Sequence, residues 1–315
     1  MADMLTITLN PALDMSTSVA RVVPEEKLRC AAPVYDPGGG GINVARAVRL
    51  LGGRAEAFVA LGGYRGEQLA DLLRAEGVAV LPFAVAGETR VSLAVRDEGA
   101  DAQYRFVMPG PVWDADMAGA VLSEIETVMD GGLVVLSGSQ PDGVPVAFPA
   151  QLAAMVAAKG ARLILDTSGA PLAAFVQAGI GVDVLRLDHA ESEALAGRAL
   201  PEVADVAGFA QSLVARGVAR AVVLARGSHG SVLANEEGCW RAVTPEVPVV
   251  SKVGAGDSFV GAFTLALARG AADEQALRHG VAAASAAVMS EATDLCRAAD
   301  ARALLDTCQV QAIPA

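Results

Sequence analysis

The segment Ser251–Phe263 combines glycines, a carboxylate and a hydroxyl at the start of an apolar helix. It reads SKVGAGDSFVGAF, so two glycines precede Asp257. The first N–H groups of a helix have no partners within it and carry partial positive charge, so they bind anions. Asp257 beside such a site could accept the proton of an attacking hydroxyl during phosphoryl transfer. The alternative is that Asp257 or Ser258 only caps the helix.

Ser258 also allows a second class of chemistry, hydrolysis. A G-D-S triplet before a helix can present a serine nucleophile, which needs a histidine and a supporting acid. The chain has no G-x-S-x-G motif, and no D-x-x-H follows the triplet. The sequence therefore favours phosphoryl transfer over hydrolysis.

A second glycine cluster, PGGGGINVAR at residues 37–46, precedes another expected helix. Gly38 and Gly39 let a ligand approach bare backbone, and Asn43 can donate to and accept from sugar hydroxyls. The cluster is not a Walker A loop, because no Lys-Ser or Lys-Thr follows it. The alternative is a tight turn from strand to helix. Asp14 follows a strand, where open α/β sheets place ligand residues, although a lone carboxylate there is also typical of a loop.

Four basic side chains fall in two stretches that alternate apolar and polar residues. A guanidinium binds phosphate through parallel hydrogen bonds, so several basic groups on one surface predict a phosphorylated substrate. The alternative for each is a solvated strand face. The stretches are residues 16–34 and 89–107, and the four candidates among their basic side chains are Lys27, Arg29, Arg90 and Arg105.

Three carboxylates and a glycine-rich turn predict a nucleotide and metal site. Asp166 ends a strand, and Asp188 and Glu191 are three residues apart, on one helical face, where they could position Mg²⁺ directly or through water. Asp188 could instead be a helix N-cap. The turn ARGSHG, residues 225–230, follows a strand and suits a nucleotide phosphate or ribose.

These residues must be positioned by alternating strands and helices. Short β-branched runs alternate with longer stretches rich in alanine and leucine, a pattern typical of a parallel sheet with crossover helices. We expect strands at residues 5–9, 57–61, 133–137, 163–166, 182–185 and 221–225. We expect helices at residues 42–51, 66–76, 115–129, 145–159, 189–196, 203–216, 257–269 and 274–289.

The two stretches of alternating apolar and polar residues, about residues 16–34 and 89–107, do not follow this order of strand and helix. Alternation with a period of two is typical of a sheet with one solvated face. We therefore expect a small antiparallel β lid inserted into one large α/β domain that spans residues 1–315, because the chain contains no linker or internal repeat.

The composition restricts the classes of function. The 315 residues are 53% hydrophobic and carry a net charge of −12, which disfavours nucleic-acid and membrane-surface partners. No secretory signal or long apolar span occurs. Four dispersed cysteines and three dispersed histidines indicate reduced thiols and argue against zinc. We expect a cytoplasmic protein.

The two glycine-rich segments together resemble the signatures of the PfkB (ribokinase-like) family of carbohydrate kinases. They read GGGGINVARAVRLLGG and GAGDSFVGAF, in the family's order, and the similarity extends along essentially the whole chain. The segments TLNPALD, EKLRCAAPVYDPGGGG, ETR and QYRFVMPG are most similar to the family's phosphosugar kinases. Gly40 stands where the kinases of fructose 1-phosphate and tagatose 6-phosphate usually carry lysine.

The resemblance implies a three-layer α/β/α fold with a mainly parallel sheet. It also implies ATP- and Mg²⁺-dependent phosphorylation of fructose 6-phosphate to fructose 1,6-bisphosphate, a step of glycolysis, by a homodimer paired through its lids. The alternatives are kinases of fructose 1-phosphate or tagatose 6-phosphate and, from another class, a sugar-phosphate sensor that binds without turnover.

The resemblance also implies residue roles. Asp257 would be the catalytic base, and Gly254, Ala255 and Gly256 would form an anion hole. The sugar would contact Asp14, Gly38, Gly39, Asn43 and Ser139. Its phosphate would contact Lys27, Arg90 and Arg105, of which Lys27 could also contact ATP, while Arg29 would reach a partner subunit's site. The nucleotide would contact Arg186, Asp188, Ala225, Gly227, Gly230 and Ser285, and the metal would contact Glu191, Asp188 and Asp166.

Three segments depart from the family's pattern. Its K-P-N-x-x-E becomes Arg186-Leu187-Asp188-x-x-Glu191, its S/T-L-G becomes Ala225-Arg226-Gly227, and its G-S-x-P-P-G becomes GSQPDG. These departures concern the nucleotide contacts, the metal affinity and the choice of phosphate donor.

Overall fold

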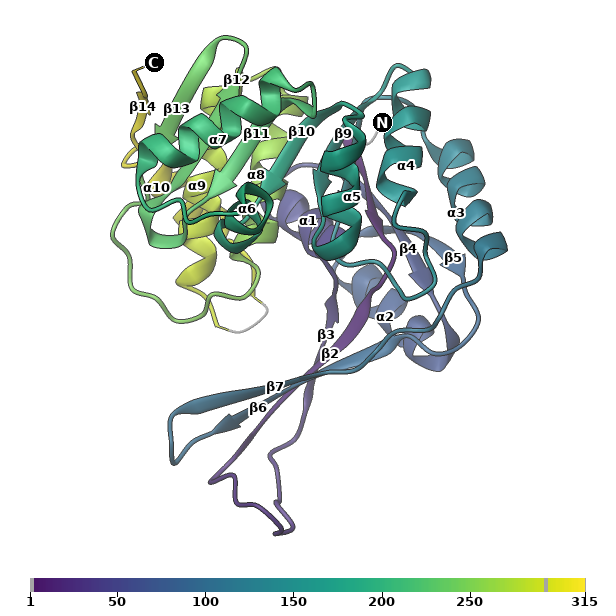
Figure 1. The fold of residues 1–315 in the computed structure, drawn as a ribbon. Coiled ribbons are helices and arrows are strands. Elements are labelled where there is room, and N and C mark those ends of the chain that lie inside the picture. Colours follow the sequence, from purple (N-terminus) through teal and green to yellow (C-terminus); the bar gives the residue numbers. More distant parts are fainter. Residues whose placement is uncertain (1–2, 292–293, 315) are drawn as a thin grey trace.

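The large sheet contains ten strands, with helices on both faces (Figure 1). The computed structural model describes residues 3–291 and 294–314. Neighbouring strands from β11 to β5 are parallel, and β12, β13 and β14 extend one edge in antiparallel fashion. In sheet order the strands are β14 (Val310–Ala312), β13 (Gly238–Ala242), β12 (Ser231–Asn235), β11 (Ala219–Ala225), β10 (Val182–Leu187), β9 (Arg162–Asp166), β8 (Leu133–Ser137), β1 (Met4–Thr8), β4 (Ala55–Leu61) and β5 (Ala79–Ala84).

The helices form two layers, and each layer buries its own apolar core against the sheet. One core contains side chains of α3 (Ala115–Val128), α4 (Phe148–Ala158), α5 (Gly169–Ala178) and α7 (Val203–Ala215), and α6 (His189–Ala196) packs at its margin. The opposite core contains side chains of α1 (Gly40–Leu50), α2 (Gly63–Ala75), α8 (Ala255–Ala268) and α9 (Asp273–Val288). A third cluster joins α10 (Ala298–Leu305) to α1, α8 and α9. The predicted three-layer α/β/α fold is confirmed.

A second, four-stranded sheet projects from the large one (Figure 1). Its order is β3 (Val34–Gly38), β2 (Ala12–Val19), β6 (Arg90–Asp97) and β7 (Ala102–Val107). Both outer pairs are antiparallel, as expected for the lid. The central pair, β2 with β6, is parallel. Alternation of apolar and polar residues predicts a strand but not its direction relative to a distant strand, so the sequence could not predict this pairing.

The lid has one apolar and one polar face, because successive side chains of a strand point to opposite sides. Tyr35, Met15, Leu93 and Phe106 are aligned across the four strands on one face. The other face carries Asp14, and also Arg90 and Arg105 at even spacing along their strands. In the part of the chain that the structure describes, no helix is long and apolar enough to cross a bilayer.

Candidate active site

Asp257 lies in the first turn of α8, at the carboxyl side of the large sheet. The helix begins after Gly254, whose φ of 74° lies in the left-handed region, and no side chain caps it. The interpretation of Asp257 or Ser258 as the N-cap is therefore wrong. Ser258 is fully buried and its Oγ accepts a hydrogen bond from the Cys296 N–H at 3.3 Å, so it is not exposed as a nucleophile.

A guanidinium group lies beside the start of α8. The N–H groups of Ala255, Gly256 and Asp257 have no acceptor within the helix, because they belong to its first turn. A Cβ at Gly256 would lie 3.2 Å from Nη2 of Arg186, which lies on β10. Arg186 Nη1 also donates to Asp166 Oδ1 at 3.1 Å. The site therefore combines backbone donors with a fixed cation, a combination that stabilises anions.

The Asp257 carboxylate is poised to exchange a proton near neutral pH. Burial raises its pKa from 3.8 to about 7, and the nearby Asp166 carboxylate acts in the same direction. The hydrogen bond from Asn43 Nδ2 to Asp257 Oδ2, at 2.9 Å, and the charge of Arg186 oppose this rise in pKa. A carboxylate with such a pKa is suited to general-base catalysis.

Asn43 is held in place by a chain of side chains reaching to α2. Its Oδ1 accepts a hydrogen bond from Arg46 Nη1 at 3.3 Å. Arg46 is buried and donates to both oxygens of Glu76, at 2.7 and 2.8 Å. Bidentate pairs of this kind fix orientation, so Glu76 and Arg46 position the amide that contacts Asp257.

The four glycines of residues 38–41 pack against the ends of neighbouring strands. A Cβ at Gly39, Gly40 or Gly41 would overlap β1 or β8, and Gly39 has a φ of 131°. A Cβ at Gly38 would instead overlap the carboxylate of Asp14. Tight packing against β1 and β8 therefore explains Gly39, Gly40 and Gly41. The missing side chain at Gly38 leaves room for the carboxylate of Asp14.

Asp14 and two arginines share the polar face of the lid. Burial raises the pKa of Asp14 to about 6, and the charges of Arg90 and Arg105 oppose that rise. Arg90 Nη2 donates to the Asn10 carbonyl at 3.1 Å, and Arg105 is exposed. The structure thus brings three predicted substrate residues to one surface.

A cavity of about 310 Å³ beside these residues contains two amides that sequence analysis missed. Asn10 Nδ2 donates to Ser139 Oγ at 3.2 Å, which places the predicted Ser139 here. Asn10 Oδ1 and both polar atoms of the Gln140 amide are buried without a partner among the described residues. Buried polar groups are normally paired, so these atoms are available to a ligand. Two segments noted in the sequence contain these amides: TLNPALD contains Asn10, and the departure GSQPDG contains Gln140.

The nucleotide residues predicted near β11 lie in a turn whose middle, residues 227–229, is exposed. Ala225 ends β11, and the Arg226 N–H donates to the Gly230 carbonyl at 2.8 Å. Gly227 and Gly230 have positive φ angles of 55° and 85°, which glycine adopts readily. Ser285 lies buried on α9, where its Oγ donates to the Val281 carbonyl at 2.9 Å.

The three predicted metal carboxylates already have hydrogen-bond partners. Asp188 is the N-cap of α6 and forms a capping box with Glu191, so the capping interpretation is confirmed. Each of the two keeps one oxygen outside that box, whereas both Asp166 oxygens are engaged, by Ser137 and Arg186. Burial raises the pKa of Glu191, and the carboxylate charges of Asp188 and Asp166 act in the same direction, while the hydrogen bond from the Asp188 N–H and the charge of Arg186 oppose the rise. Within residues 3–291 and 294–314, no three His, Cys, Asp or Glu side chains are grouped to hold a metal ion.

Lys27 and Arg29 are exposed in the loop that joins β2 to β3, at the end of the lid distant from the large sheet (Figure 1). Neither side chain forms a hydrogen bond or ion pair with another described residue. The fold of one chain therefore does not bring them to Asp257.

Comparison with known sequences gives a match to the pfkB family carbohydrate kinase model over residues 8–300. The chain is 42% identical over 296 residues to ATP-dependent 6-phosphofructokinase isozyme 2 of Escherichia coli strain K12, covering 94% of this chain and 96% of that protein. It is 34% identical to a 1-phosphofructokinase of Xanthomonas campestris, covering 84% and 83%.

Comparison with solved structures agrees with this match. Phosphofructokinase-2 from Escherichia coli in complex with fructose-6-phosphate superimposes with a TM-score of 0.90 at 40% identity, covering 98% of this chain and 99% of that one. A tetrameric inhibited form of that enzyme gives a TM-score of 0.91 at 40% identity, with the same coverage.

Proposed function

Because the chain belongs to the pfkB family of carbohydrate kinases, we propose that it transfers the γ-phosphoryl group of ATP to fructose 6-phosphate, forming fructose 1,6-bisphosphate and ADP. This is a 6-phosphofructokinase reaction of glycolysis. The whole chain would act as one kinase domain with an inserted lid. Four free cysteines are compatible with the cytoplasm, where we place it.

The observation that carries the proposal is Asp257 beside the donors at the start of α8. The C1 hydroxyl of the sugar would give its proton to Asp257 as its oxygen bonds to the γ-phosphorus, while the bond from that phosphorus to the β,γ-bridging oxygen breaks. The N–H groups of Ala255 and Gly256, with Arg186, would stabilise the charge on the transferred group. No covalent enzyme intermediate is required.

The substrate's own phosphate would bind near the polar face of the lid. Arg90 and Arg105 lie on that face, and their charges act on Asp14, which suits a sugar hydroxyl. The cavity with Asn10 and Gln140 adjoins Arg90, and its unpaired amide atoms suit hydroxyl or phosphate oxygens. Asn43, Gly38, Gly39 and Ser139 complete this proposed sugar site.

ATP would lie between the start of α8 and the turn after β11, with Gly227 and Gly230 along it and Ala225 at the strand end. The oxygens that Asp188 and Glu191 leave outside their capping box fit Mg²⁺ held directly or through water, and Asp166 fits a direct ligand less well because both of its oxygens are engaged. Bound Mg²⁺ would neutralise phosphate charge. Ser285, with its hydroxyl bonded inside α9, would at most pack near the nucleotide.

We also propose that two copies pair through their lids. The apolar face of the lid leaves Tyr35 at 38%, Tyr104 at 41% and Phe106 at 49% exposure, and a contiguous exposed apolar patch is typical of a protein–protein interface. Pairing there would cover this face. It would also carry Lys27 and Arg29 toward the partner's site, where they could contact phosphate.

A coupled assay of ADP release tests the proposed activity with fructose 6-phosphate, fructose 1-phosphate, tagatose 6-phosphate and fructose. We expect the highest kcat/KM for fructose 6-phosphate. A higher value for another hexose phosphate would reassign the substrate within the family. Binding of fructose 6-phosphate without ADP release from any sugar would contradict the kinase and indicate a sensor.

A further inference from the structure

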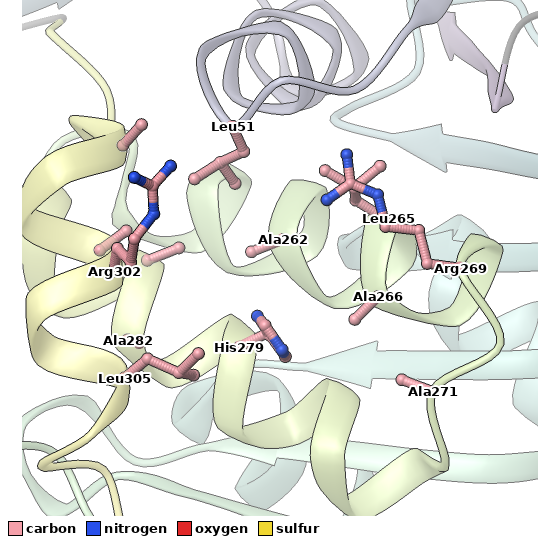
Figure 2. A pocket seen from close by; sticks show the side chains of 13 residues that line it. Leu51, Ala262, Leu265, Ala266, Arg269, Ala271, His279, Ala282, Arg302 and Leu305 are labelled. Carbon is pink, nitrogen blue, oxygen red and sulfur yellow. The ribbon is translucent and has the colours of Figure 1, made fainter.

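A second cavity, of about 230 Å³, lies apart from the proposed active site. Figure 2 shows it between α8, α9, α10 and the end of α1. Its lining residues on α8 belong to the second half of that helix, from Ala262 onward, whereas Asp257 is in the first turn. The cavity is therefore formed by the same helix but at a different place.

Most of the wall of this cavity is apolar. Small side chains line it where the helices face one another, and Leu51, Leu265 and Leu305 close its sides. Alanine at facing positions leaves space that larger side chains would fill. The apolar lining suits a ligand with a hydrocarbon body. The alanines are Ala262, Ala266, Ala271, Ala282, Ala283, Ala298 and Ala301.

Three basic side chains line the same cavity, and no Asp or Glu does. Arg269 and Arg302 lie on opposite sides in Figure 2, with His279 between them. Arg269 Nη2 donates to the Gly52 carbonyl at 3.1 Å, while Arg302 and His279 have no hydrogen bond or ion pair with any other described residue. In a chain whose net charge is −12, three basic groups without a carboxylate form a local anion-attracting surface.

The pKa of His279 depends on its burial and on the positive charges around it. Burial lowers the pKa of His279, and the charges of Arg278 and Arg269 lower it further. Arg278 is itself engaged with the carbonyls of Leu305 and Cys308. The two charges that act on His279, those of Arg278 and Arg269, are thus both cationic, and Arg278 Nη2 also lies 3.9 Å from Oδ1 of the exposed Asp306 at the end of α10. An anion placed between the basic groups would oppose their effect on His279.

We propose that this cavity binds a small organic anion that has an apolar body. Guanidinium groups bind carboxylate and phosphate oxygens, and the alanines and leucines accommodate the body. The volume is smaller than the ~300–1,000 Å³ of sites for drug-sized ligands, so the ligand is a small acid. The inference does not depend on which sugar the kinase phosphorylates.

Calorimetric titration with 3-methylbutanoate tests whether the cavity binds a ligand that has both a negative charge and an apolar body. Its neutral isostere 3-methylbutanamide is the control for charge, and inorganic phosphate is the control for the body. We expect saturable binding of the carboxylate alone, which strengthens as the pH falls, because a bound anion favours the protonated form of His279. Equal binding of the amide, binding of phosphate alone, or no saturation at about 20 mM carboxylate would each overturn the proposal.

Two variants locate the site. Arg302→Ala should weaken carboxylate binding by about 3- to 10-fold, less than the usual loss for a charged hydrogen bond, because Arg302 is exposed and solvent screens its charge. The control Arg297→Ala removes an exposed arginine that does not line the cavity and should leave binding unchanged. Unchanged ADP release by both variants would show that they fold. Equal carboxylate binding by both would contradict the proposed site.

The cavity can also be filled without changing charge. Ala298→Leu places an isobutyl group at its lining and should abolish carboxylate binding, whereas Ala299→Leu, at the neighbouring exposed position outside the lining, should not. Retained binding by a folded Ala298→Leu variant would place the ligand elsewhere.

Discussion

The raised pKa of Asp257 makes this residue costly to the folded state, so Asp257→Asn should stabilise the protein while it removes activity. The pKa is about 7 in the folded protein, because of burial, against 3.8 for an ordinary aspartate. Since one pKa unit corresponds to 1.36 kcal/mol, ionised Asp257 destabilises the fold by about 4 kcal/mol above pH 7. Asparagine avoids that cost and can still accept the hydrogen bond from Asn43.

The sign of the pH dependence follows from the direction of the pKa shift. A folded pKa above the unfolded one means that the native state binds the proton more tightly, so stability is lost as pH rises from about 4 to 7. We expect Asp257→Asn to raise the free energy of unfolding by ~3 kcal/mol at pH 6 and ~4 kcal/mol at pH 8. These are upper limits, because the site is partly open to solvent.

Urea unfolding followed by fluorescence of Trp113 and Trp240 measures this difference at both pH values. Asp71→Asn is the control, because Asp71 is 76% exposed and should change the free energy of unfolding by less than ~0.5 kcal/mol. Turnover of Asp257→Asn should fall by about 10²- to 10⁴-fold, the usual loss for a general base. A stabilisation that is absent, or that decreases from pH 6 to pH 8, would refute the reasoning.

Four further substitutions test separate parts of the site. Arg105→Ala should lower kcat/KM for fructose 6-phosphate by about tenfold and leave fructose unaffected, because it removes one charged hydrogen bond to phosphate; equal losses would argue against that contact. Gln140→Leu should raise KM for fructose 6-phosphate by about 5- to 30-fold with unchanged folding, since its unpaired amide would no longer meet the sugar; an unchanged KM would remove it from the site. Asp188→Asn keeps the N-cap, and the lost charge should raise the Mg²⁺ concentration for half-maximal rate about 2- to 5-fold; an unchanged midpoint would leave only the capping role. Phe106→Asp should shift the sedimentation coefficient toward that of a monomer, because it places charge on the apolar face of the lid; an unchanged sedimentation coefficient would exclude this face as the interface.

Local patterns in the sequence predicted most of the large domain. The predicted bounds of the strand 133–137 and of the helix 189–196 match β8 and α6, because apolar runs and glycine ends are local signals. The helix at α5 and the antiparallel edge formed by β12, β13 and β14 were missed. The three strands of that edge are short, and the pairing that stabilises an edge strand lies outside the segment itself.

The site residues also divide into those that local sequence patterns could predict and those that they could not. Asp257, Asn43 and Asp14 could be found because each lies beside a glycine-rich segment or a strand end. The support of Asn43 by Arg46 and Glu76 could not, since it joins separate helices whose spacing in sequence carries no pattern. The same holds for Gln140, whose importance appears only where the fold leaves its amide buried and unpaired.

The parallel pairing of β2 with β6 determines when the lid can form during folding. Residues 12–19 pair with residues 90–97, and the intervening chain contains β3, which belongs to the lid, and α1, β4, α2 and β5, which belong to the large domain. The entropy lost in closing so long a loop is recovered only after those elements have docked on the large sheet. The lid is therefore a late-forming unit with few buried contacts of its own, and its amides should exchange with solvent through local opening while those of β1 and β8 require global unfolding.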